Sequence, residues 1–184
     1  MDTNFERELL NYLYHDLNRM MQFVGNEIFE FDVQCSIDFF LRFKLQNANY
    51  KISREKNGKV DHVIENKSSN KSSLLEVKSF IKKNEKIKYD VIKADIDKTF
   101  KKINENKNSE GYLILITKQS HLKSTNKKSI ELIRLLTGTK QIFYFDKVKT
   151  RLLKSYITMY KNKTEFVPHN SQLRVFMFQI LIDN

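Results

Sequence analysis

Three charged side chains lie on two neighbouring apolar segments of the chain. Asp61 ends one segment, and Glu76 and Lys78 lie two residues apart within the next. Residues two apart on a strand share a face, so we expect Glu76 and Lys78 to project together, and Asp61 to join them from an adjacent strand. Two carboxylates and one ammonium at a single spot suit a divalent metal ion and an activated water. This is the chemistry of phosphodiester hydrolysis.

The charge of the 184-residue chain is unevenly distributed. Its formal net charge is +11, with −4 in residues 1–50 and +15 in residues 51–184. A basic body of this size attracts a polyanion such as nucleic acid, although a generally solvated, lysine-rich surface is the alternative from charge alone. Candidate phosphate contacts are the lysine clusters at 82–88, 98–102, 118–128 and 147–154.

Composition excludes several classes of protein. The one cysteine, Cys35, allows no internal disulfide and no cysteine-based metal centre, and we expect it to be a buried small apolar residue. The sequence contains no apolar run near the roughly 20 residues that span a bilayer, and the acidic, amphipathic N-terminus is unlike a secretory signal. No phosphate-binding P-loop or dinucleotide fingerprint is present. These features predict a cytoplasmic protein without a membrane partner.

Two helices are predicted before the charged residues. Residues 1–27 form the first, with an apolar stripe that runs to Gly25. The second begins between Asn26 and Asp32, and its buried face is predicted to hold Val33, Ile37, Leu41, Leu45 and Ala48. Glu30 lies on the extension of that stripe.

A hairpin is predicted next, at Asn57-Gly58, a pair that favours two-residue turns. Its arms are residues 50–56 and 59–64, and a two-residue loop places Arg54 opposite Asp61. A polar loop at 66–73 then leads into a strand at Leu74–Phe80, antiparallel to the preceding one.

A crossover is predicted after this strand. Asp90 is expected to cap a helix that carries Ile92, Ile96, Phe100 and Ile103 at helical spacing. Tyr112–Thr117 is a nearly continuous apolar run, typical of a central strand buried on both faces. A strand, a helix and a second strand in this order predict parallel pairing.

The C-terminal part is predicted to add helices and strands. The expected elements are a helix at Ser129–Leu136, a strand at Gln141–Phe145, a helix at Leu152–Tyr160, and a hairpin of Thr164–Val167 with Leu173–Ile182. Within the last of these, Val175–Ile182 is unusually apolar. It is interpreted as a buried strand, with a dimer interface as the alternative.

The order helix, three-strand meander, helix, strand resembles the PD-(D/E)XK nuclease superfamily, whose fold is the restriction-endonuclease-like α/β fold with an αβββαβ core around a mixed sheet. The resemblance covers about residues 28–117 of a predicted single nuclease domain, 1–184, in which 1–27 is an N-terminal helix and 118–184 an elaboration. Gly58–Ile64 resembles the first motif, with Val60 in place of proline. Glu-x-Lys occurs three times, but only at Glu76 do strand residues flank it on both sides.

The resemblance implies a metal site on the two strands. Asp61 and Glu76 would bind Mg²⁺, or Mn²⁺ in its place, with the Val77 carbonyl as a further ligand. Lys78 would orient or help deprotonate the attacking water and offset the charge on the phosphate.

Two further residues are implied by the helices on either side of the meander. The family often carries an acidic residue on the first helix, for which Glu30 is the candidate. An exposed acid near a helix start is the equal alternative for Glu30. Lys93 is the candidate on the following helix, from which many members send a Gln or Lys to the site. His62 flanks Asp61 but points to the opposite face, so a packed role is favoured over catalysis.

The implied activity is that of a Mg²⁺-dependent endonuclease, most simply a small type II restriction-type enzyme that cuts double-stranded DNA as a homodimer. An RNA endonuclease or junction resolvase of the same fold is an alternative. A noncatalytic nucleic-acid-binding module and a basic structural protein with an accidental triplet are the alternatives from other classes.

Overall fold

The computed structural model describes residues 3–24, 28–46, 49–54, 60–82, 85–154 and 173–182. The helices are α1 (Thr3–Val24), α2 (Glu30–Lys44), α3 (Tyr89–Glu105) and α4 (Lys127–Thr137), with a short 3₁₀ turn, η1 (Gln119–His121). The strands are β1 (Tyr50–Ser53), β2 (His62–Asn66), β3 (Lys71–Phe80), β4 (Ser109–Lys118), β5 (Ile142–Phe145), β6 (Val148–Lys154) and β7 (Leu173–Ile180).

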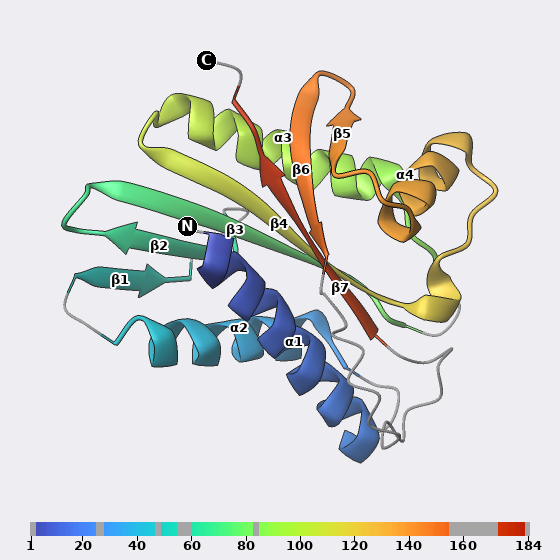
Figure 1. Cartoon of the computed structure of the whole chain (residues 1–184), viewed down its shortest axis with the longest axis horizontal. Coiled ribbons are helices and arrows are strands. Elements are labelled where there is room, and N and C mark those ends of the chain that lie inside the picture. Colours follow the sequence, from blue (N-terminus) through green and yellow to red (C-terminus); the bar gives the residue numbers. More distant parts are fainter. Residues whose placement is uncertain are drawn as a thin grey trace.

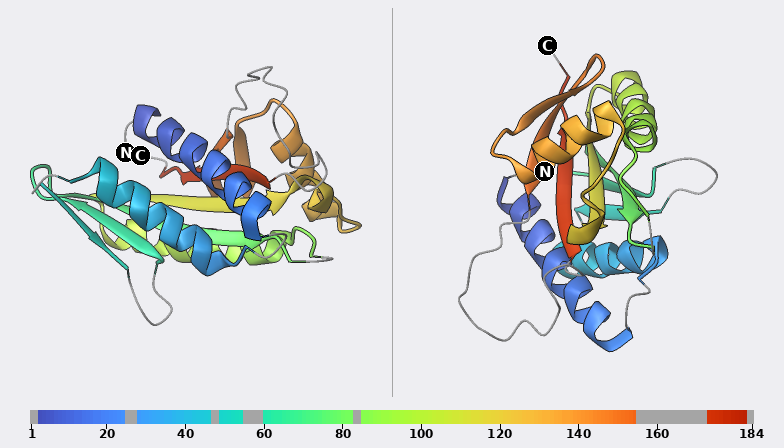
Figure 2. Two further views of the ribbon diagram at one scale, coloured as in Figure 1. Left: turned by 90° about the horizontal axis from the view of Figure 1, so that it is seen from below. Right: turned by 90° about the vertical axis from the view of Figure 1, so that its right-hand side faces the viewer.

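The strands form one mixed sheet of order β1-β2-β3-β4-β7-β6-β5. β3 and β4 are parallel, as predicted, and the other neighbours are antiparallel. Helices α1 and α2 cover one face of the sheet, and α3 and α4 cover the other (Figures 1 and 2). The chain is therefore an α/β protein, and its elements from α2 to β4 follow the predicted order αβββαβ.

The apolar patterns of α2 and α3 account for the two layers. Val33, Ile37 and Leu41 are fully buried on α2, as predicted, whereas Ala48 lies outside the described residues. On α3, the cap is Lys88 and the helix begins at Tyr89, so Asp90 occupies the first turn instead of capping it. Of the helices in the described ranges, none has both the length and the apolar character of a membrane crossing.

β7 lies in the middle of the sheet, between β4 and β6. Its residues Val175, Met177 and Phe178 are fully buried. The interpretation of this segment as a buried strand is confirmed. The alternative interpretation as a dimer interface is wrong, because both sides of β7 pair with strands of the same chain.

The helix predicted at Leu152–Tyr160 is wrong over its first residues, which belong to strand β6. Val148, Thr150 and Leu152 are buried at alternate positions, the period of a strand. Residues 155–172 lie outside the described residues, and the predicted strand Thr164–Val167 lies there too.

The β1–β2 pairing is shifted by one residue from the predicted register. Ser53 pairs with Val63 and Ile52 with Ile64, so an extension of β1 brings Arg54 opposite His62, where Asp61 was predicted. The Asn57-Gly58 turn lies outside the described residues. The polar loop predicted at 66–73 is shorter than expected, because β2 extends to Asn66 and β3 begins at Lys71.

Gly111 of β4 provides the first prediction. A Cβ at this position would lie 2.8 Å from Thr99 Cγ2, and 3.3 Å from Ile103 Cγ2 and from Ile180 Cδ1. We expect Gly111→Ala to lower the free energy of unfolding by about 1–3 kcal/mol in urea titrations, because the added methyl overpacks the contact between α3 and the sheet. Adding Thr99→Ser, which removes Cγ2, is expected to restore part of the loss. Equal stability of Gly111→Ala and the wild type would contradict this packing.

Candidate functional site

The predicted site lies where β3 extends beyond β2. β2 begins at His62, which pairs with Leu75, so the following residues of β3 have no β2 partner. Asp61 lies in a bend just before β2, and its carboxylate accepts a hydrogen bond from the Val77 amide of β3. The structure therefore brings Asp61 next to the Glu76–Lys78 segment, as the sequence predicts.

Along this edge of β3, two carboxylates accept hydrogen bonds from backbone amides that have no partner in β2. The Val77 amide donates to Asp61 Oδ2 at 2.7 Å, and the Ser79 amide donates to Glu30 Oε2 at 3.3 Å. Because the N–H and C=O of one residue point to the same side of a strand, the Val77 carbonyl also faces this edge. Asp61, Glu30 and the Val77 carbonyl thus border the same stretch of β3.

A polar row on α2 holds these groups in place. Glu30, Gln34 and Asp38 follow one another at helical spacing on the side of α2 that faces β2 and β3. The Gln34 amide donates to Asp61 Oδ1 at 2.9 Å. Gln34 has no part in the sequence prediction, although its four-residue spacing from Glu30 is a signal that could have pointed to it.

Glu76 is the most constrained group of the site. It is 5% exposed, and its Oε1 accepts a hydrogen bond from Lys98 on α3. Its Oε2 is buried and has no hydrogen-bond partner in the described residues. Burial raises the pKa of Glu76 to about 7, with Asp61 and Asp95 adding to the shift and Lys98 opposing it.

Lys78 projects to the same face as Glu76 and lies among carboxylates. Its Nζ is 3.5 Å from Asp95 Oδ2 on α3 and 3.8 Å from Glu30 Oε2 on α2. Burial lowers the pKa of Lys78, but Asp95 and Glu30 outweigh that effect, so the pKa lies above its ordinary value. Lys78 is therefore a charged ammonium at neutral pH.

The contribution of α3 differs from the prediction. The prediction that Lys93 reaches the site is wrong, because its ammonium group pairs with Asp97 and Asp146 and not with Glu76. Lys98 takes that position instead, and Asp95 lies beside it. Asp95 sits three residues after the buried Ile92, so a charged residue within the apolar stripe was the available signal.

The site as a whole suits a hard cation. The site contains four carboxyl groups (Glu30, Asp61, Glu76 and Asp95) and two ammonium groups (Lys78 and Lys98), so acidic groups outnumber basic ones within a basic protein. The buried Oε2 of Glu76 has no hydrogen-bond partner in the described residues, and the Glu76 carboxyl group interacts electrostatically with Asp61. Carboxylate and carbonyl oxygens are the donors that Mg²⁺ prefers. Within the described ranges, no group of three or more His, Cys, Asp or Glu side chains is placed so that it could hold a metal ion. The fitting donors are thus Asp61, Glu76 and the Val77 carbonyl.

His62 has the packed role favoured by the sequence. It is fully buried, and its Nε2 lies 3.1 Å from Asp38 Oδ1, although the two groups are not aligned for a hydrogen bond. Burial lowers the pKa of His62, against the attraction of Asp38. Arg54 completes this cluster, 2.9 Å from the other Asp38 oxygen. The expectation for Cys35 is wrong, since this side chain is exposed on the outer face of α2.

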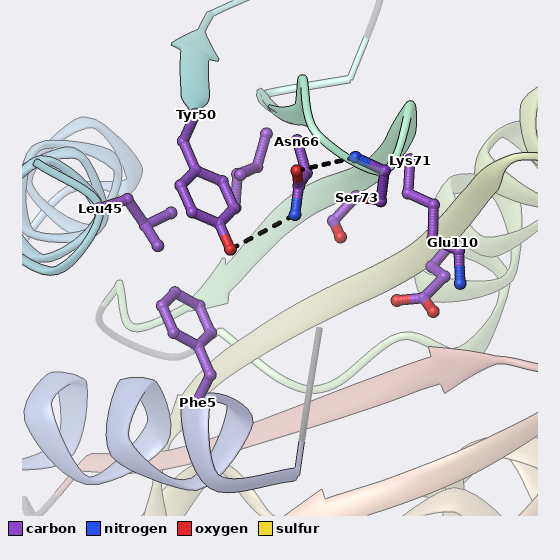
Figure 3. A pocket seen from close by; sticks show the side chains of 9 residues that line it. Phe5, Leu45, Tyr50, Asn66, Lys71, Ser73 and Glu110 are labelled. Carbon is purple, nitrogen blue, oxygen red and sulfur yellow. Dashed lines mark hydrogen bonds between the residues drawn. The ribbon is translucent and has the colours of Figure 1, made fainter. Parts of the chain in front are cut away.

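A separate pocket of about 200 Å³ lies near the other end of β3 (Figure 3). Phe5 of α1, Leu45 and Tyr50 form one wall, and Asn66 donates to the Tyr50 hydroxyl at 3.4 Å. Glu110 is the only carboxylate among its described lining residues. This pocket therefore lacks the paired acids that distinguish the β3 edge.

No protein-family model, no curated protein and no solved structure matches the chain. Its function is therefore inferred from the geometry of this site.

Lys98 and Lys93 form a matched pair for testing the buried ion pair. We expect Lys98→Met to lower the free energy of unfolding by about 3 kcal/mol at pH 8, because it leaves the Glu76 carboxylate buried without a counter-charge. The same change at Lys93, whose partners are on the surface, is expected to alter stability little. Urea unfolding of both variants measures the difference. Equal effects of the two changes would argue against a structural Lys98–Glu76 pair.

Proposed function

We propose that the chain is a metal-dependent phosphodiester hydrolase with a restriction-endonuclease-like fold. More specifically, we propose a Mg²⁺-dependent endodeoxyribonuclease, of the small restriction type. The observation that carries this proposal is the buried Glu76 Oε2, which has no hydrogen-bond partner in the described residues, on a side chain that interacts electrostatically with Asp61 and Lys78. Burying such a group costs free energy, and a bound cation would recover that cost.

The donor set assigns the groups that would hold the ion. Asp61 and Glu76 would bind Mg²⁺ or Mn²⁺ through their carboxylates, and the Val77 carbonyl faces the same edge. When bound, the ion would supply Lewis-acid stabilisation of the charge that develops on the phosphate. Because the pKa of Glu76 is about 7, its carboxyl group loses its proton near neutral pH. The resulting carboxylate would then be able to bind a cation.

The remaining residues would position and neutralise the substrate. Lys78, held as an ammonium by Asp95 and Glu30, would donate to a phosphate oxygen and orient the attacking water. Its raised pKa supports this role over that of a base. Glu30, fixed by the Ser79 amide, is a positioning residue for Lys78. The basic segment 51–184 supports a polyanionic substrate.

The test is direct incubation of the purified chain with supercoiled plasmid, single-stranded DNA and RNA, with Mg²⁺ or with EDTA. We expect DNA cleavage in Mg²⁺ and none in EDTA, and mapping of the ends will show the cut position. Cleavage of RNA alone would assign the same site to a ribonuclease. A junction resolvase would cut branched DNA in preference to linear duplex. A homodimer, which suits cutting of both strands, stays a prediction that sedimentation will test.

A noncatalytic nucleic-acid-binding module is the second candidate, favoured by one observation. The Lys98 ammonium already pairs with Glu76, as an internal cation in place of a metal ion. Titration calorimetry separates the two candidates. The enzyme is expected to bind Mg²⁺ or Mn²⁺ and to lose that binding in Asp61→Asn, whereas the module is expected to bind DNA without taking up either ion.

A further inference from the structure

A cavity of about 470 Å³ adjoins the candidate site on the side of the α2 N-terminus. It shares Glu30 and Lys78 with that site, and its volume is in the range of small-molecule sites, about 300–1,000 Å³. Its lining also includes Phe29, Phe31, Lys82, Glu85 and Lys88. The cavity is therefore continuous with the residues proposed to act on a phosphate.

Two aromatic rings in this cavity are exposed to solvent. Phe29 is 54% exposed and Phe31 is 63% exposed, so much of each ring is open to a ligand. The Arg54 guanidinium lies 5.6 Å from the centre of the Phe31 ring, and the backbone amide of Phe29 donates to Asp32 Oδ2 at 2.7 Å. The Phe31 ring therefore has a cationic neighbour, and the backbone that carries the Phe29 ring is fixed at the start of α2.

Charge at the cavity favours an anionic ligand that also has an aromatic part. Lys82 and Lys88 are exposed on its rim, and Lys78 lies at its junction with the candidate site. Two acidic residues also line the cavity, and each accepts a hydrogen bond from a backbone amide: Glu30 from that of Ser79, and Glu85 from that of Lys82. Exposed aromatic rings interleaved with lysines are the pattern with which proteins bind single-stranded nucleic acid.

We propose that this cavity binds an unpaired nucleotide of the DNA strand, with its base stacked on Phe29 or Phe31 and its phosphates at Lys78, Lys82 and Lys88. Bases in a duplex stack on one another, so their faces reach a protein ring only when they are unpaired or extruded. The substrate class that follows is DNA that is single-stranded, or opened, at the phosphate beside Lys78. This inference deepens the proposed function and rests on it for the identity of that phosphate.

The test measures binding in EDTA, so that it does not depend on cleavage. Labelled single-stranded DNA and a duplex of the same length are titrated with the wild type and with Phe29→Ala/Phe31→Ala, and anisotropy gives the dissociation constants. We expect the double variant to bind single-stranded DNA at least about tenfold more weakly and the duplex within about twofold of the wild type. A fluorescent base analogue in the oligonucleotide is expected to be quenched by the wild type and not by this variant.

The same helix supplies a matched control. Phe39 and Phe43 are 64% and 62% exposed, and neither lines the cavity. We expect Phe39→Ala/Phe43→Ala to bind both DNAs like the wild type. Phe29→Tyr/Phe31→Tyr, which keeps the rings, is expected to retain the binding. Phe31→Ala alone keeps the test available if the double variant does not fold.

Three results would overturn the inference: unchanged single-strand binding by the Phe29/Phe31 variants, equal losses for single strand and duplex, or tighter binding of RNA than of DNA of the same sequence. Failure of the proposed function is distinguishable. A protein that never cleaves in Mg²⁺ but shows the ring-dependent binding retains this inference and loses the hydrolase. A protein that cleaves DNA in Mg²⁺ but binds single-stranded DNA equally well with Phe29 and Phe31 replaced retains the hydrolase and loses the cavity.

Discussion

Glu76→Gln is expected to reduce Mg²⁺-dependent DNA cleavage by at least about 10³-fold. The change keeps the size of the side chain but removes the negative charge that would face the ion, and a metal ion supplies several kcal/mol of transition-state stabilisation. Initial rates on plasmid measure the effect. DNA binding in EDTA is expected to remain, since Glu76 is buried beneath the surface that phosphates would reach.

The chain contains a control for this substitution. Glu105 begins another Glu-x-Lys triplet but is exposed at the end of α3, so Glu105→Gln is expected to cleave like the wild type. Lys78→Met is expected to lose cleavage as Glu76→Gln does, while it keeps Mg²⁺ binding in calorimetry. Full cleavage by both Glu76→Gln and Lys78→Met would remove the basis for the proposed site.

The second large effect is on the pH dependence of stability. The folded pKa of Glu76, about 7, lies above the ordinary value of 4.5, so the native state holds a proton that the unfolded chain has released between those values. The contribution of this pKa shift to the free energy of unfolding is fully present below pH 4.5. It is lost as the pH rises to 7, which lowers the free energy of unfolding by about 3 kcal/mol in total. We expect Glu76→Gln to gain this amount relative to the wild type over the same interval.

The wild type must be compared with Glu76→Gln because the pKa shift of His62 changes stability with pH in the opposite direction. Its folded pKa is lowered by burial, so its contribution is present above pH 6.5 and is lost as pH falls through the folded pKa. Urea titrations of the wild type and Glu76→Gln at several pH values cancel this effect, which both proteins share. Added Mg²⁺ is expected to stabilise the wild type more at pH 8 than at pH 5.5. Parallel stability curves for the two proteins would mean that Glu76 is not desolvated.

The strands of the core could be predicted because each one has, within its own segment, the apolar pattern of a buried strand. Tyr112–Thr117 is apolar at nearly every position, and the Glu76–Lys78 segment has apolar neighbours on both sides, so each was recognisable as an interior strand. The middle position of β7 was not predictable in this way. It depends on which strands pair across long separations, and no local pattern specifies the partner.

The site was predictable only as far as one strand determines its own geometry. Glu76 and Lys78 share a face by strand alternation, and the approach of Asp61 follows from the antiparallel meander. Which helical residue reaches Glu76 depends on the rotation of α3 against the sheet, and this rotation separates Lys98 from Lys93. The phenylalanines at the start of α2 gave no signal, because an exposed ring and a buried one look alike in a sequence.

The position of β7 has a consequence for synthesis on the ribosome. A nascent chain that has emerged only as far as residue 154 carries β4 and β6, but the strand that joins them is still missing. Both apolar layers include β7 residues, so neither can close at that stage. The unpaired edges of β4 and β6 would then be open to other chains, and the interval before Leu173–Ile180 emerges is the one in which a chaperone would protect this protein from aggregation.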